Sequence, residues 1–574
     1  MTRLTHVQAF SAAAVFGAAL LVAAAPALAQ PSKPLPALAP APKDGLTRSL
    51  AHGEITPAKY ALERALSLFR PRRVSAMYGR VERPDANSAT LILRDLSIRL
   101  DELSAADRQK AAALLARPTD NPNPDDINTY GRTDEQTPVC GAHVCIHYVI
   151  TGKHAVSATD TSPANGIPDY VDQALQVFDV TVWGTEVTTM GYRAPKSDIK
   201  SSNNGSSSAD PTGAKFDVYL ANLGDDFIYG YCTSDDPHLK RSTRYDYYDM
   251  SAYCVVDNNF TEPIFSTRTP LENLEVTAAH EFFHGIQFAY DISEDRWIME
   301  ATAVWMEDEL YDDIDDNLQY LPDGPLRKPR VPLDKSTTSC CHIYGDWIFF
   351  RFLSEWFGDG GGSTLDPTTT GQDQAVVREI WERLDGSKTG VDDYSIQGVK
   401  HVLSNRGKNF RKVFGKFGWS NRVSRSVYDE GADNKYPQAP LADKMTLSSS
   451  SPSRSKAPTL NHQTSRYYEF KRGSGVSSTA KLRFVLDLPS KKAGAFATAL
   501  VFTNAGFRAK EFAISNTANG TFSVAFGSSV RKVDLVLTNA STRYTCWVSG
   551  SSPYACLGAP KDDGRTYKFK ARLA

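Results

Sequence analysis

The stretch His280-Glu281-Phe282-Phe283-His284 decides how the centre of this chain folds. On a helix, residues four apart share one face, so His280 and His284 can both bind one metal ion. Glu281 can then reach a water molecule bound to that ion, which is the arrangement of a zinc site. The apolar residues in and around this stretch predict a buried helix: Leu274, Val276, Ala278, Phe282, Phe283, Ile286 and Phe288. The alternative interpretation is a pair of histidines that only pack in a core helix.

A second run of the sequence, 297–308, supplies a candidate third ligand. A zinc ion held by two histidines needs a third protein ligand and an open position for water. One unbroken helix from His284 to Glu300 would span about 24 Å, which is too far for a shared ion. The polar run 290–295 therefore predicts a turn, after which Glu300 lies early on a second helix packed against the first. We expect Glu300 to be the ligand, with Glu307 as the fallback; a solvated helix carboxylate is the alternative.

The blocks HEFFHGIQFAYD (280–291) and WIMEATAVWMED (297–308) resemble a known group of enzymes. They are similar to secreted bacterial zinc metallopeptidases of the hyicolysin kind and, more closely, to a family of secreted bacterial metalloproteases that carries this same block. The resemblance covers about residues 130–430 and is specific at the zinc block.

The resemblance implies a gluzincin site, in which His280, His284 and Glu300 hold Zn²⁺ and Glu281 is the general base. It also implies a protein or peptide substrate, whose peptide bonds a zinc-activated water hydrolyses. Two other functions stay open. The domain could be a catalytically silent surface or binding protein that retains zinc, although a structural zinc site has no use for Glu281. Its zinc-bound water could instead serve an amidase that acts on cell-wall peptides.

A third block, 344–353, resembles the tyrosine-glycine helix that follows the zinc site in those peptidases. The resemblance places Tyr344 or His342 near the zinc, where either could donate a hydrogen bond to the substrate carbonyl oxygen. Tyr344 is the preferred catalytic candidate, and either residue could equally be a packing residue. At Val304 the chain lacks the aspartate with which thermolysin-like peptidases orient a histidine, so we expect Glu307 or Asp308 to replace that contact.

The first residues, 1–29, have the pattern of a signal peptide. Arg3 gives a positive start, an apolar run follows, and Ala27-Leu28-Ala29 forms a small-residue cleavage site. We therefore expect a mature chain that begins at Gln30 and is secreted to the periplasm or the extracellular space. No later apolar stretch is long enough to predict a membrane anchor. A net charge of -2 gives no indication of a nucleic-acid partner, and the oligomeric state stays open.

The 8 cysteines of an exported chain predict disulfide bonds. Proximity in the sequence suggests three pairs: Cys140 with Cys145, Cys232 with Cys254, and Cys546 with Cys556. The adjacent Cys340 and Cys341 either pair with each other or pair elsewhere.

These patterns predict an α+β fold with the following domains. They are a signal peptide (1–29), an N-terminal linker and propeptide-like or structural region (30–138), a zincin-like metallopeptidase domain of mixed sheet plus helical subdomain (139–445), a linker (446–458) and a C-terminal all-β sandwich (459–574).

Two strands carry predictions about the site. The alternating run 90–100 predicts a strand in the N-terminal region, which is either a propeptide that shields the zinc site or a retained subdomain. The run 251–258 predicts a strand shortly before the zinc helix. Zincins pair such an edge strand with an extended substrate, so we expect this strand to lie at the sheet edge.

The loop from Asp160 to Asp172 predicts a second, weaker metal site. Asp160, Asn165, Asp169 and Asp172 surround a glycine turn, and such oxygen donors suit Ca²⁺. The regular acidic spacing of an EF-hand is missing. An Asn-Gly turn capped by Asp ahead of a helix explains the same residues.

Overall fold

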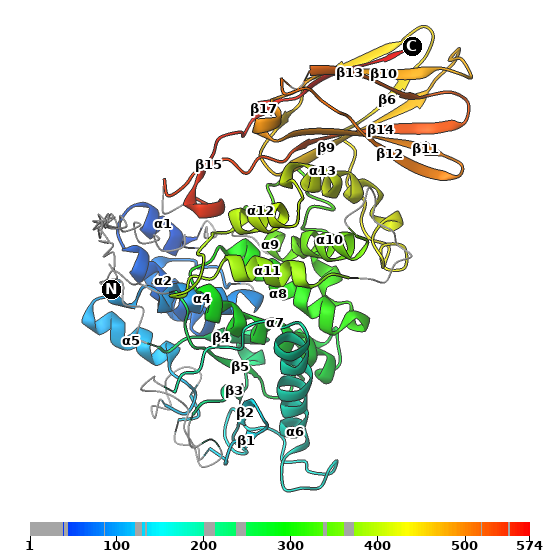
Figure 1. The fold of residues 1–574 in the computed structure, drawn as a ribbon. Coiled ribbons are helices and arrows are strands. Elements are labelled where there is room, and N and C mark those ends of the chain that lie inside the picture. The colour runs from blue at the N-terminus through cyan, green and yellow to red at the C-terminus, as the bar shows by residue number, and fades with distance from the viewer. Residues whose placement is uncertain are drawn as a thin grey trace, which may run out of the picture.

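The structure is a computed structural model in which helices and sheets are mixed, as the sequence predicts (Figure 1). It describes residues 38, 44–84, 86–120, 129–131, 135–199, 210, 213–236, 248–336, 341–360, 372–517, 519–548 and 552–574. The predicted signal peptide, 1–29, and Cys340 lie outside the described residues. Among the helices that are described, none combines the length and the apolar character needed to cross a membrane.

A five-stranded sheet lies at the centre of the molecule (Figure 1). Its strands in spatial order are β1 (Val139–Cys140), β2 (Val144–His147), β3 (Phe216–Ala221), β5 (Tyr253–Asp257) and β4 (Gly230–Thr233). β2, β3 and β5 are parallel, and β4 runs antiparallel to β5. The strand predicted at 251–258 exists as β5, but its predicted edge position is wrong. The short β4 lies outside it, and four residues carry no alternation from which to recognise a strand.

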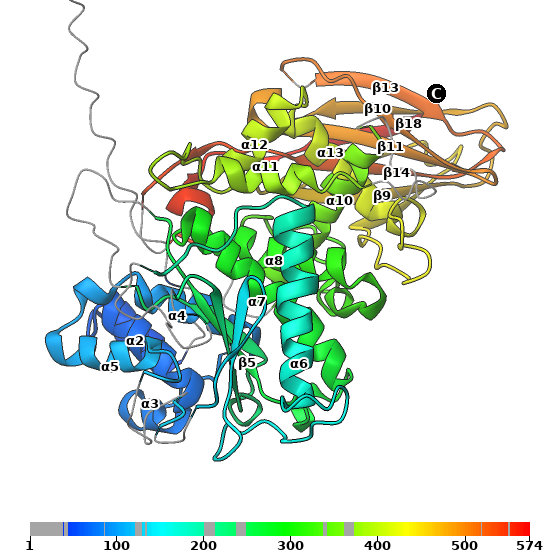
Figure 2. The same cartoon turned by 60° about the horizontal axis from the view of Figure 1, so that its bottom comes forward.

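Both faces of this sheet are buried, because successive side chains of a strand point to opposite faces. Val218 and Cys254 belong to a core that also contains the apolar residues of the zinc-motif helix. Tyr219 and Tyr253, one position along each strand, belong to a second core with the N-terminal helices. Figure 2 shows these N-terminal helices gathered beside the sheet, on the side away from α6 (Asp169–Leu175).

The N-terminal region is helical throughout its described elements. They are α1 (Gly45–Ala51), α2 (Pro57–Phe69), α3 (Pro71–Tyr78), α4 (Ala89–Ser97) and α5 (Ala105–Leu115). The strand predicted at 90–100 is therefore wrong, because these residues form α4. Every residue of α4 is buried, including Arg94 and Asp95. The alternation that suggested a strand, 96–100, spans the end of α4 and the turn after it, where polar Ser97 and Arg99 are buried beside apolar neighbours.

The rest of the central region is mainly helical, as predicted. The elements are α6 (Asp169–Leu175) with the π-helical turns Gln176–Val182 and Gly184–Thr189, α7 (Pro270–Asp291), α8 (Arg296–Leu310), the short helix η8 (Asp316–Tyr320), α9 (His342–Gly345), α10 (Trp347–Gly358), α11 (Ala375–Arg383), α12 (Ile396–Asn405) and α13 (Phe410–Ser420).

The C-terminal part is all β and forms two facing sheets, as predicted (Figure 1). One sheet has the order β13 (Asn519–Ala525), β10 (Lys481–Asp487), β18 (Lys568–Leu573), β7 (Ser453–Lys456). The other has the order β12 (Gly506–Glu511), β11 (Ala495–Thr503), β14 (Val530–Asn539), β9 (Thr464–Arg472), β6 (Asp443–Leu447). Short strands complete it: β8 (Thr459–Leu460), β15 (Tyr544–Thr545), β16 (Ala559–Pro560) and β17 (Arg565–Thr566).

The linker predicted at 446–458 is wrong, because this run contributes β7 and the end of β6 to the two sheets. Met445 and Leu447 alternate with exposed residues and point into the core between the sheets. The serines that suggested a linker lie in and around β7, at the edge of its sheet. The sandwich therefore begins near Asp443 rather than at residue 459.

The disulfide predictions are confirmed for three pairs: Cys140–Cys145, Cys232–Cys254 and Cys546–Cys556. The first two bonds join directly opposite residues of neighbouring strands. Cys341 is also disulfide-bonded. The question of a Cys340–Cys341 bridge involves Cys340, which is not described.

A buried histidine joins the sandwich to the central region. His462 Nε2 lies 2.8 Å from Oδ1 of Asp334, in the loop ahead of α9, and its Nδ1 lies 2.5 Å from Oδ1 of Asp563 in the sandwich. Burial alone would lower the pKa of His462, but the two carboxylates raise it from 6.5 to about 9. A charged imidazolium can donate one N–H hydrogen bond to each carboxylate, so this contact is strongest when His462 is protonated.

We predict that this contact makes the stability of the chain depend on pH. The folded pKa of about 9 lies above the unfolded value of 6.5. The stabilisation is therefore complete below about pH 6.5 and is lost as the pH rises through 9. Relative to His462→Gln, the wild type should lose up to about 3 kcal/mol over this range. Thermal unfolding of both proteins checks this. A Tm difference that stays constant from pH 6 to pH 9.5 would contradict it.

Candidate metal centre

Helices α7 and α8 carry the polar residues of the predicted zinc site. The N terminus of α7 is fixed by a capping box, in which the side chains of Thr269 and Glu272 each accept a hydrogen bond from the other's backbone N–H. The chain reverses at 292–295, as predicted, and α8 packs back against α7. His280, His284 and Gln287 of α7 are buried where that helix meets α8 at Glu300 and Met299.

The structure brings His280, His284 and Glu300 together in a compact triangle. The Nε2 atoms of the two histidines lie 3.1 Å apart. Glu300 Oε2 lies 3.3 Å from His280 Nε2 and 3.6 Å from His284 Nε2. All three side chains are buried. These donor atoms are close enough to one another to bind one metal ion.

Each histidine is oriented by an acceptor on its other ring nitrogen. His280 Nδ1 lies 2.5 Å from Glu307 Oε1, and His284 Nδ1 lies 2.7 Å from Gln287 Oε1. If each Nδ1 carries the proton, each Nε2 keeps its lone pair for a metal. Glu307, the fallback ligand, is thus placed behind His280. Gln287 also donates to the backbone oxygen of Met299, which links α7 to α8.

The donor set fits a divalent cation that prefers nitrogen and oxygen ligands, as zinc does. Burial acts to raise the pKa of Glu300, and the imidazoles of His280 and His284, when they are protonated, lower it to about 2, so the carboxylate is ionised beside positive charge. Glu300 Oε2 is buried without a hydrogen-bond partner. A buried carboxylate oxygen without such a partner is costly unless a cation satisfies it.

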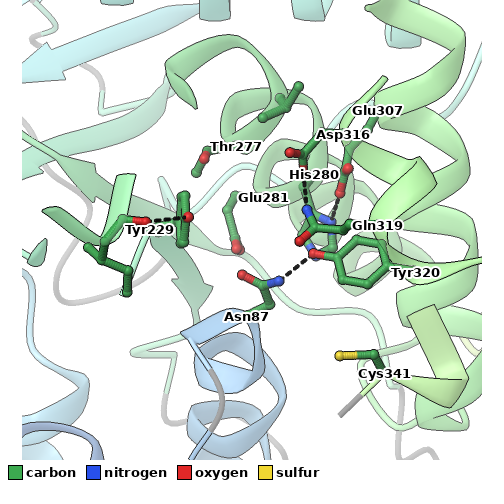
Figure 3. A pocket seen from close by; sticks show the side chains of 13 residues that line it. Asn87, Tyr229, Thr277, His280, Glu281, Glu307, Asp316, Gln319, Tyr320 and Cys341 are labelled. Atoms are coloured by element: carbon green, nitrogen blue, oxygen red, sulfur yellow. Dashed lines mark hydrogen bonds and ion pairs between the residues drawn. The ribbon is translucent and has the colours of Figure 1, made fainter. Parts of the chain in front are cut away.

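Glu281 lines a cavity of about 250 Å³ beside this triangle, together with His280 and Glu307 (Figure 3). Its Oε2 accepts a 2.6 Å hydrogen bond from Thr90 Oγ1. The edge strand β4 closes one side of the cavity at Gly230. A methyl group at Gly230 would lie only 3.2 Å from Glu281 Cγ, so glycine lets the strand approach the carboxylate.

The two predicted donors, Tyr344 and His342, do not line this cavity in the structure. The Tyr344 ring is stacked near His280, with its centroid 6.4 Å from that of His280, and its hydroxyl donates to the backbone oxygen of Asn87. Both ring nitrogens of His342 lie 3.0 Å from backbone oxygens of the loop that contains Asp323 and Pro332. Both residues therefore have contacts typical of packing residues.

Tyr320 is the tyrosine that lines the cavity (Figure 3). It lies at the end of η8, stacks on Tyr344 and accepts a 2.5 Å hydrogen bond from Asn87 Nδ2. No pattern in the sequence indicates Tyr320, because η8 is a short helix within a polar loop. Gln287 was recognisable in principle, since it lies three residues after His284 on the same helix face.

Asp308, the other residue expected to orient a histidine, faces away from the triangle. Its carboxylate accepts from Arg351 at 2.7 Å and from Asn317. Asp308, Asp312 and Glu430 are also close enough together for a shared ion. Arg351 Nη2 lies 2.6 Å from Glu430 Oε1, so a guanidinium already supplies positive charge there. Among the described residues, the triangle is therefore the stronger metal candidate.

The loop from Asp160 to Asp172 uses its carboxylates for its own turn. Asp160 accepts from the backbone N–H groups of Asn165 and Gly166, and Asp169 accepts from those of Thr161 and Ser162. This is the geometry of the capped turn that the sequence also allowed. The calcium site stays a prediction.

Comparisons with protein-family models and with curated proteins find no match. The chain has partial similarity to a number of solved structures. Three of them are the pre-peptidase C-terminal domain of collagenase from Bacillus anthracis (11% identity, 24% of this chain and 97% of that chain, TM-score 0.14), the periplasmic g-type lysozyme inhibitor PliG of Aeromonas hydrophila (12% identity, 23% and 100%, TM-score 0.14) and the GH115 4-O-methyl-alpha-glucuronidase BtGH115A (8% identity, 54% and 39%, TM-score 0.12). Such low TM-scores carry no argument about fold or function, so the resemblance to gluzincins stays a prediction.

Proposed function

We propose that this chain is a secreted zinc peptidase with a zincin-like domain. The observation that carries the proposal is the convergence of His280, His284 and Glu300 beside a cavity that Glu281 lines. Three protein ligands with an adjacent cavity are typical of a catalytic rather than a structural zinc site. The disulfide bonds and the predicted signal peptide support secretion.

When bound, zinc would polarise a substrate carbonyl and lower the pKa of a water molecule. Glu281 would accept the proton of the attacking water and pass it to the leaving amine. Glu281 lines the cavity together with His280. Tyr320, on another wall, would donate a hydrogen bond to the carbonyl oxygen as negative charge develops there. The buried setting strengthens these interactions, because little water screens them.

The proposal predicts that proton transfer and metal binding can be separated by mutation. Glu281→Ala should keep zinc but lose about 10²-fold or more in turnover, because that carboxylate moves protons. His280→Ala, His284→Ala and Glu300→Ala should each lose zinc, because each removes a ligand. Glu307→Ala should keep most of its zinc, with an affinity about 10- to 100-fold weaker. Elemental analysis and a peptide-release assay on the purified variants measure both properties.

Two results would contradict this assignment in different ways. Full zinc in Glu300→Ala together with loss of zinc in Glu307→Ala would exchange the roles of these two carboxylates. Full activity of Glu281→Ala would remove the hydrolytic mechanism itself. Casein, cell-wall peptides and short free-amine peptides should be tested in parallel with wild-type protein, because cleavage of cell-wall peptides alone would favour the amidase.

The cavity geometry also predicts which tyrosine contributes to turnover. Tyr320→Phe should lower kcat by roughly tenfold, because the hydroxyl that stabilises the developing charge is lost. Tyr344→Phe is the matched control, since Tyr344 does not line the cavity and its hydroxyl donates to the Asn87 backbone oxygen, and its kcat should change by less than about threefold. Steady-state kinetics of the two variants check this. A larger loss in Tyr344→Phe than in Tyr320→Phe would return Tyr344 to the catalytic role.

A further inference from the structure

A residue of the N-terminal helix α4 contacts the general base directly. Thr90 Oγ1 lies 2.6 Å from Glu281 Oε2, and both side chains are buried. Thr90 precedes Glu281 by almost two hundred residues, so nothing in the local sequence indicates the contact. It is a tertiary contact made by the second residue of α4.

The direction of this hydrogen bond is fixed by a third group. The backbone N–H of Cys232, on edge strand β4, donates to Thr90 Oγ1 at 2.9 Å. A backbone N–H can only donate, so Thr90 accepts from it and has its own proton left for Glu281. The Thr90 hydroxyl therefore donates to Glu281 Oε2 and does not accept from it.

The helix that carries Thr90 is held firmly against both metal-binding helices. Arg94 Nη1 donates to the backbone oxygens of Ile292 and Glu294, in the turn between α7 and α8, at 3.0 and 2.9 Å. Arg296, at the start of α8, donates to Asp95 at 2.5 Å and to the Leu91 backbone oxygen. These contacts are buried, so α4 is fixed relative to the residues that Thr90 serves.

The N-terminal helices also complete the core of the central sheet. Tyr231 and Tyr253 pack in one apolar cluster with residues of α2, α4 and α5. The hydroxyl of Tyr253 donates to the backbone oxygen of Leu115, at the end of α5. Removing these helices would expose one whole face of the sheet to water. The free energy lost by exposing this apolar surface would exceed the unfolding free energy of a typical domain.

We propose that Thr90 is a positioning residue for Glu281 and that the active peptidase retains α4. The Thr90 hydroxyl holds Oε2 of Glu281, and Oε1 is then the oxygen that would accept the proton of the attacking water. This inference rests on the proposed peptidase function. It makes the region 30–138 a structural part of the enzyme rather than a propeptide that must leave. If the N-terminal region were inhibitory, the change in kcat would have the opposite sign, since weakening its contact with Glu281 would raise activity.

The test compares two substitutions of Thr90 in the full-length, zinc-loaded protein. Thr90→Val keeps the shape and removes the hydroxyl, and Thr90→Ser keeps the hydroxyl. We expect Thr90→Val to lower kcat about tenfold or more, the usual effect of losing a hydrogen bond to a charged group. KM should stay within about twofold and zinc content should be unchanged, because Thr90 binds neither substrate nor metal. Thr90→Ser should restore kcat to within about threefold of the wild type.

Two controls separate positioning from a general effect on α4. Ser97→Ala removes another buried hydroxyl from the same helix, one that donates only to the Arg94 backbone oxygen, and should leave kcat within about twofold. In a Glu281→Ala background, Thr90→Val should cause no further loss, because the group that Thr90 positions is already gone.

Each other outcome is decisive. An unchanged kcat in Thr90→Val, with an active wild type, overturns the positioning role and leaves the proposed function intact. A raised kcat overturns it in favour of an inhibitory contact. Equal losses in Thr90→Val and Thr90→Ser would make the effect one of packing. N-terminal sequencing of the active enzyme tests retention, since a chain that begins after Ser97 would overturn it. A wild type that binds zinc but releases no peptide would instead overturn the proposed function.

Discussion

The packing of α8 against α7 is the interaction on which the rest of the structure depends. The two histidines on α7 are only two of the three candidate zinc ligands. Glu300 reaches them only because the chain reverses at 292–295. Segments far apart in the sequence meet at this turn. Arg94 donates to its backbone from the N-terminal side. Asp295, its last residue, accepts from the Tyr394 hydroxyl and from the Cys556 backbone N–H of the C-terminal part.

This convergence gives the flanking regions a physical role in the candidate site. Ligand side chains buried in a low-dielectric setting must be held close to one geometry, because each unpaired polar atom there is costly. Glu307 and Gln287 fix the rings of His280 and His284, and both lie on the same two helices as the ligands. Arg94 of the N-terminal helices and Cys556 of the C-terminal part both bind the turn between α7 and α8. These contacts fix the position of the two helices relative to each other.

The sequence predicted the parts of the site that depend on one helix or on helix pairing. The i, i+4 spacing of His280 and His284 and the need for a reversal before Glu300 follow from helix geometry alone. The contacts of Tyr320 and Thr90 could not be predicted, because they depend on tertiary packing between segments with no local signal. The strand predicted at 90–100 was wrong for a related reason. The alternation at 96–100 spans the end of α4 and the turn after it, and polar residues of α4 such as Arg94 are buried by tertiary contacts that the sequence does not show.

The most direct test of the central claim is X-ray absorption spectroscopy of the purified protein loaded with one zinc ion. A site built from His280, His284 and Glu300 predicts two imidazole nitrogens and carboxylate and water oxygens at about 2.0–2.2 Å, with no sulfur ligand. The spectrum of Glu300→Ala should differ in its oxygen shell or lack bound zinc. A wild-type spectrum with zinc–sulfur scattering near 2.3 Å, or with no imidazole scattering, would contradict the account.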